Sequence, residues 1–145
     1  MSGRRDRVTD HFVLGEFDCR DGAQVRGRDE GAIAHLASWW LEPLRATFGP
    51  VTVRSGFRSV PYNRLVGGAR YSVHLLRTPL PRRPRQSAVK AAAADVTCAT
   101  GNPALWAEWA RQHRARFPHL GALGRGGIGF YSTFVHLDTG PARDW

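Results

Sequence analysis

Apolar residues recur along one stretch of the chain at the spacing of an α-helix. Between residues 29 and 48, a stripe with a repeat of about 3.6 residues is formed by Ile33, Leu36, Trp40, Leu44 and Phe48. We therefore expect a helix from about Asp29 to Phe48 that turns this stripe toward a core. Gly49-Pro50 should end the helix, because neither residue continues one readily.

Short apolar runs elsewhere predict strands. They are Val51–Arg54, Ala91–Thr97, Gly127–Tyr131 and Phe134–Asp138, with the last two joined as a hairpin around Ser132-Thr133. Two more helices are expected, a short one over residues 61–66 and a longer one over residues 103–117 that begins after Asn102. Together these elements predict an α+β fold in which helices pack against a small antiparallel sheet.

The length of 145 residues suits a single domain. Residues 1–10 are polar and are expected to form a flexible arm, which leaves one domain over residues 11–145. The segment His11–Gly22 mixes apolar residues with turn formers, so it should lie over the domain and pack Phe12, Leu14 and Phe17 inward. The tryptophans at helical spacing are interpreted as core residues.

Residues 75–88 interrupt the pattern with three prolines and four arginines, the latter being Arg77, Arg82, Arg83 and Arg85. Proline removes hydrogen-bond donors and arginine resists burial, so this insertion is predicted to be an exposed basic loop. It can dock the protein on an anionic surface or a neighbouring subunit. The alternative is an insertion without a role, because lengthening a surface loop costs little.

The chain carries 21 Lys and Arg against 12 Asp and Glu, a formal net charge of +9. This charge favours an anionic partner, although arginine-rich codon usage explains it equally well. Nucleic acid is the weaker choice of partner, since no aromatic platform or DNA-reading motif accompanies the arginines.

No apolar run is long enough to span a membrane, and the N-terminus has no apolar stretch typical of a secretory signal. Cys19 and Cys98 are compatible with either a disulfide or two free thiols.

Candidate chemistry centres on two histidines and two aspartates. On a strand, His136 and Asp138 project from the same face, and His74 follows a glycine turn. Asp95 stands alone in an alanine-rich strand, where a buried carboxylate needs a cation as partner. Two His and one Asp can hold Zn²⁺ and leave a fourth position open for water, as in a hydrolytic site. An ion pair of Asp95 with an arginine is the simpler alternative.

Four segments of the chain carry a resemblance to a known family. They are His11–Gly22, Val51–Ser72 with the following His74, Ala93-Ala94-Asp95, and Gly126–Trp145. Their S-G-F-R-S, S-x-H, A-x-D and H-x-D elements occur in an order that resembles the zinc D-Ala-D-Ala carboxypeptidase family, in its small single-domain branch of phage and bacterial wall peptidases.

The resemblance implies a fold shared with the hedgehog signalling domain and zinc ligands at His74, Asp95 and His136. It further implies that Arg58 polarises the scissile carbonyl and that Ser72 helps to hold the peptide.

Two positions depart from the family pattern. Asp95 follows His74 by 21 positions, where relatives have seven, so the basic loop is an insertion of roughly 14 residues. Thr133 stands where well-known relatives carry the glutamate that acts as base. Asp138 is our candidate for the general base, because it shares a strand face with His136. Equally open is a supporting role, in which Asp138 hydrogen-bonds the second nitrogen of that ligand.

The expected function is zinc-dependent hydrolysis of peptide bonds in peptidoglycan stem peptides, as a carboxypeptidase or endopeptidase of the phage or prophage endolysin type. The alternative is a catalytically weak or inert zinc-stabilised structural or binding module, such as a component of a phage particle. Without an apolar leader, the protein is expected to be made in the cytoplasm. It would then reach the cell wall after lysis, through a holin, or within a virion.

Overall fold

A computed structural model of the chain describes residues 6–25, 29–69, 72–76, 91–116 and 126–145. In chain order, its elements are β1 (Arg7–Thr9), β2 (Phe12–Val13), the 3₁₀ helix η2 (Leu14–Phe17), α1 (Glu30–Leu36), the π-helical segment η4 (Ala37–Leu41), α2 (Glu42–Phe48), β3 (Val51–Ser55), α3 (Val60–Leu65), the 3₁₀ helix η5 (Val73–Leu75), β4 (Ala93–Cys98), α4 (Pro103–Ala115), β5 (Gly127–Phe130), β6 (Val135–Asp138) and β7 (Arg143–Asp144). The predicted basic loop lies outside the described residues from residue 77 onward, so the exposure and docking role of its arginines stay predictions.

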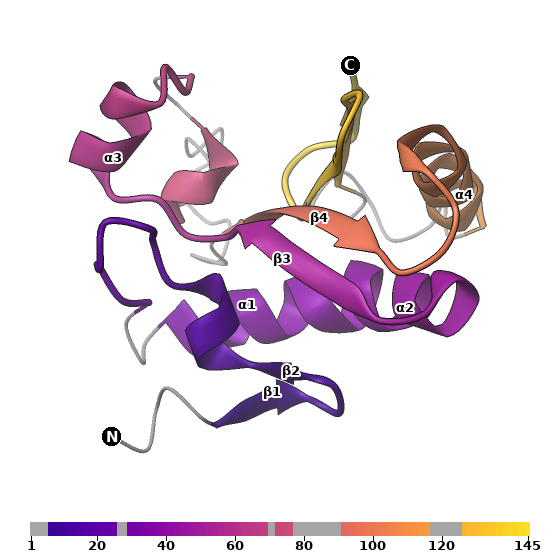
Figure 1. The fold of residues 1–145 in the computed structure, drawn as a ribbon, viewed down its shortest axis with the longest axis horizontal. Coiled ribbons are helices and arrows are strands. Elements are labelled where there is room, and N and C mark those ends of the chain that lie inside the picture. Colours follow the sequence, from indigo (N-terminus) through magenta and orange to yellow (C-terminus); the bar gives the residue numbers. More distant parts are fainter. Residues whose placement is uncertain (1–5, 26–28, 70–71, 77–90, 117–125) are drawn as a thin grey trace, which may run out of the picture.

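Five strands form one sheet in the order β3-β4-β6-β5-β7. The first four are antiparallel neighbours, as predicted, while β7 pairs parallel with β5 and was not expected. Figure 1 shows α1 and α2 running beneath the sheet and α4 standing beside it. This arrangement confirms the α+β fold.

Strand alternation divides the sheet into a core face and a second face. The apolar residues Ala94, Val96, Val135, Leu137 and Ile128 belong to the hydrophobic core. The residues between them, including Asp95 and His136, therefore project from the opposite face. One face of the sheet thus packs into the core, and the other carries the polar residues of the candidate site.

The helix predicted over residues 29–48 is confirmed as the continuous run α1-η4-α2, with a π-helical segment in its middle. Pro43 explains the irregularity, because it has no N–H to donate to the carbonyl of Trp39 four residues earlier. The Trp39 carbonyl instead accepts a hydrogen bond of 2.8 Å from Nε2 of His113 on α4. Burial lowers the pKa of His113, which fits a neutral core histidine.

The N-terminal segment packs as expected in one part and differs in another. Phe12, Leu14 and Phe17 are buried in the core, as predicted for the segment His11–Gly22. Within the expected arm, however, Arg7–Thr9 form β1 and pair with β2, because Val8 packs against the core.

Cys19 and Cys98 are free thiols. None of the described helices is long and apolar enough to cross a membrane.

Candidate metal centre

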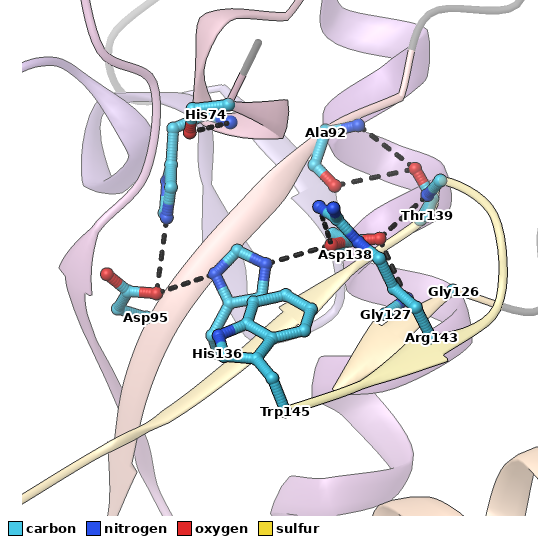
Figure 2. Close-up of polar contacts among 12 residues, drawn as sticks. His74, Ala92, Asp95, Gly126, Gly127, His136, Asp138, Thr139, Arg143 and Trp145 are labelled. Atoms are coloured by element: carbon cyan, nitrogen blue, oxygen red, sulfur yellow. Dashed lines mark hydrogen bonds and ion pairs between the residues drawn. The ribbon is translucent and has the colours of Figure 1, made fainter. Parts of the chain in front are cut away.

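Three side chains distant in sequence meet on the second face of the sheet. Asp95 on β4 and His136 on β6 are direct cross-strand partners, and η5 places His74 beside them (Figure 2). Oδ1 of Asp95 lies 3.2 Å from Nε2 of His74 and 2.9 Å from Nδ1 of His136. All three residues are buried, and the three ligand atoms lie within 4.8 Å of one another. The structure therefore brings together the ligand set that the sequence predicted.

The second nitrogen of each histidine is held by a partner of its own. Nδ1 of His74 lies 2.6 Å from the backbone carbonyl of Gly56, and Nε2 of His136 lies 2.8 Å from Oδ2 of Asp138. These acceptors hold the proton on the outer nitrogen and turn the other nitrogen of each ring toward Asp95. Such outer partners are typical of histidines that ligate metals. Two nitrogens and one carboxylate oxygen fit a divalent cation such as Zn²⁺.

Protonation in the site follows from the same contacts. Burial alone would raise the pKa of Asp95, but hydrogen bonds from His136 and His74 lower it well below its usual range. Burial would lower the pKa of His136, but hydrogen bonds to Asp138 and Asp95, together with their charges, raise it. Asp95 is therefore ionised near neutral pH. A metal must displace the proton from the ligating nitrogen of His136, so protons and metal compete for that atom.

Asp138 is completely buried, and both of its oxygens are engaged. Oδ2 accepts from His136, while Oδ1 accepts from the backbone N–H groups of Gly127 at 2.8 Å and Gly140 at 2.9 Å. Burial would raise the pKa of Asp138, but the hydrogen bond and charge of His136 and these two N–H groups lower it. Of the two roles predicted for Asp138, this geometry favours support of His136 over that of general base.

Replacing Asp138 by asparagine tests this choice. If Oδ1 keeps its two backbone donors, the new amide points its NH₂ at Nε2 of His136 and drives the ring proton to Nδ1, where the metal should bind. We expect the affinity for Zn²⁺ to fall about 10–100-fold, measured by competition with a coloured chelator. Glu108→Gln, an exposed acid on α4, is the matched control. Unchanged zinc affinity with a rate loss of about 10²–10⁴-fold would instead assign Asp138 as the base.

Arg58 lies at the edge of the ligand group. Its Nη2 is 3.3 Å from Oδ2 of Asp95, and its other nitrogens contact Ser55 Oγ at 3.3 Å and Asn63 Oδ1 at 3.4 Å. Its backbone N–H donates to the carbonyl of His74 at 2.8 Å, so the S-G-F-R-S segment positions both residues. The guanidinium is thus fixed beside the three ligand side chains, and its contact with a scissile carbonyl stays a prediction.

Ser72 and Thr133 have different surroundings. The hydroxyl oxygen of Ser72 accepts from the backbone N–H of His74 at 3.2 Å and caps η5, so Ser72 supports a ligand. Its contact with a peptide stays a prediction. Thr133 is exposed in the turn between β5 and β6.

Two glycines on β5 lie at the site and were not predicted to do so. Gly127 and Gly129 share the face of β5 that carries the site, with Ile128 between them in the core. A Cβ at Gly127 would lie 2.5 Å from the Asp138 carboxylate, and one at Gly129 would lie 2.7 Å from the ring of Trp145. The alternation G-I-G is the signal that could have identified both positions.

Comparison with known proteins identifies the family of the chain. A model of the family described as Peptidase M15 matches residues 10–138, which is most of the chain. No match was found among the curated proteins. The match spans the whole S-G-F-R-S, S-x-H, A-x-D and H-x-D series and confirms the resemblance to the zinc D-Ala-D-Ala carboxypeptidases. With its His-Asp-His group, the chain therefore belongs to the peptidase M15 family and is a metallopeptidase.

Proposed function

We propose that the protein uses Zn²⁺ to hydrolyse peptide bonds in the stem peptides of bacterial peptidoglycan. The observation that carries this proposal is the buried group of His74, Asp95 and His136 with Arg58 at its edge. The wall substrate is supported by the resemblance of the motifs to the wall-peptidase branch. The net charge of +9 supports it as well, since it favours approach to an acidic wall polymer.

Each residue of the site has a separate task in this chemistry. His74, Asp95 and His136 would hold a zinc ion, which would supply Lewis acidity toward the carbonyl and would lower the pKa of bound water. Arg58 is only 17% exposed at its side chain and keeps a fixed guanidinium near the ligands, so it can donate to an oxygen that gains negative charge. Asp138 accepts from Nε2 of His136 and gives the ring a fixed orientation, with Nδ1 toward Asp95.

We further propose that the protein works on the wall from a phage or prophage context, after lysis, through a holin, or as part of a particle. The basic loop would then help it to dock on an anionic surface or a neighbouring subunit.

The decisive experiment is incubation of the zinc-loaded protein with purified peptidoglycan, followed by mass spectrometry of the released fragments. We expect free alanine from a carboxypeptidase and longer peptides from an endopeptidase. A chelator should stop the release, and added zinc should restore it. Stoichiometric zinc with no released fragment from several types of peptidoglycan would contradict the proposal.

The second candidate function is a zinc-stabilised structural or binding module. It is favoured by two observations, namely Thr133 at the position where relatives have glutamate, and the complete burial of Asp138. Under this alternative, chelation lowers the thermal stability of the protein while peptidoglycan is bound without being cleaved.

A further inference from the structure

One row of residues crosses the sheet beside the metal centre. Ser55 on β3 pairs with Asp95 on β4, which pairs with His136 on β6, which in turn pairs with Gly129 on β5. Trp145 follows β7 and extends the row, because its backbone N–H donates to Ile128 and its carbonyl accepts from Phe130, the neighbours of Gly129. Trp145 thus reaches the metal centre from the side opposite Ser55.

The indole of Trp145 lies against the ligand His136 and contacts three other residues. Its ring centroid lies 4.8 Å from that of His136, and its Nε1–H donates to the hydroxyl of Tyr131 at 2.7 Å. The guanidinium carbon of Arg143 lies 4.7 Å from the indole centroid, a cation–π distance. The ring also lies on Gly129, where any Cβ would collide with it. The position of the indole is therefore determined by the structure around it.

Despite these contacts, Trp145 keeps 44% of its surface exposed and Tyr131 keeps 39%. The Tyr131 ring stacks on Phe134, with centroids 4.4 Å apart. The other four tryptophans are in the core or pack against it. We call Tyr131, Phe134 and Trp145 the aromatic wall. Large apolar side chains that stay exposed beside a buried ligand group mark a surface for binding.

The two sides of the metal centre differ in chemistry. Arg58 lies at the β3 and β4 side through its contacts with Ser55 and Asp95. The aromatic wall lies at the β5 and β7 side, next to His136. A peptide bond placed at the ligands therefore has a cationic hydrogen-bond donor on one side and an apolar surface on the other. The donor suits a carbonyl oxygen, and the apolar surface suits a side chain.

We infer that the aromatic wall is a specificity subsite, which binds the apolar side chain of a substrate residue next to the scissile bond. This inference rests on the proposed peptidase function and adds to it a preference for apolar residues at one side of the bond. Trp145 is its main determinant, because it contacts the ligand His136 directly.

The test uses the zinc-loaded protein and a set of short peptides that carry glycine, alanine or leucine on either side of the scissile bond. Dissociation constants are measured by calorimetry, and cleavage is measured separately. At one of the two positions, the wild type should bind leucine about tenfold more tightly than glycine. Trp145→Ala should lose this preference and keep one zinc per chain. Trp145→Phe should retain most of it.

Gly129→Ala is the more specific test, because it keeps the indole of Trp145 in the protein but displaces it from its place over residue 129. It should lose the leucine preference as Trp145→Ala does. Gly31→Ala is the matched control, since a Cβ at Gly31 meets nothing within 4 Å. Near-ultraviolet circular dichroism and zinc content establish that each variant is folded.

The outcomes separate the inference from the proposed function. Two outcomes overturn the aromatic subsite without contradicting the peptidase function. In the first, the wild type cleaves peptides but binds all of them with equal affinity. In the second, Trp145→Ala and Gly129→Ala both keep the leucine preference. A leucine preference lost in both variants, with no peptide cleaved by the wild type, supports the subsite and counts against hydrolysis. Absence of any peptide binding overturns the subsite, and cleavage of peptidoglycan then decides the proposed function independently.

Discussion

Replacing His136 by alanine should abolish stoichiometric zinc binding. The wild type should carry one zinc per chain by elemental analysis after dialysis, because three protein ligands converge on one point. The variant loses the nitrogen that lies 2.9 Å from Asp95 and leaves two ligands, too few to hold the ion through dialysis. His35→Ala is the matched control, since His35 is an exposed histidine on α1.

Thermal unfolding provides an independent measurement of the same prediction. A ligand that binds only the folded state stabilises it by about 4 kcal/mol when its free concentration is 1,000 times the dissociation constant. For a domain of this size, that corresponds to a rise in the unfolding midpoint of roughly 10 °C. Zinc should produce this rise in the wild type and in His35→Ala, and none in His136→Ala. Full zinc content in His136→Ala would show that the ligand set is wrong.

Arg58→Ala should lower kcat/KM about 10²–10³-fold on the best peptide substrate, while zinc content stays at one per chain. This is the typical effect of removing one preorganised donor from a developing oxyanion. The loss should lie mainly in kcat, because the donor acts most strongly on the charged transition state.

Two further variants define the role of Arg58. Arg58→Lys should recover only part of the rate, because one ammonium group cannot reproduce the contacts that the guanidinium makes with Ser55, Asn63 and Asp95. Arg54→Ala, which removes an exposed arginine on β3, is the control and should retain full activity. An unchanged kcat in Arg58→Ala would remove Arg58 from the reaction.

Sequence periodicity was sufficient to predict those structural features that one local pattern determines. The stripe over residues 29–48 predicted the long helix, and alternation placed His136 and Asp138 on one face, where their side chains are 2.8 Å apart. The lone carboxylate among alanines predicted a cationic partner for Asp95, and Nη2 of Arg58 lies 3.3 Å from its Oδ2. These features depend on residues near one another in the chain.

Features that depend on distant neighbours were not predictable in this way. The choice between the two roles of Asp138 required the N–H groups of Gly127 and Gly140. The π-helical segment required Pro43 together with His113 of another helix. β7 is only two residues long and has no period of its own, so its pairing with β5 appears only once the sheet is assembled.

The G-I-G sequence of β5 has a consequence for how this enzyme can diversify. Both residues of β5 that face the site are glycines, so this strand adds no side chain there. The metal ligands come from η5, β4 and β6, whereas Trp145 follows β7 and Tyr131 follows β5. Mutations at Trp145 or Tyr131 can therefore change which peptides fit while every ligand stays in place. Directed evolution aimed at a new substrate should accordingly concentrate its library on residues 131 and 143–145, and keep both glycines fixed.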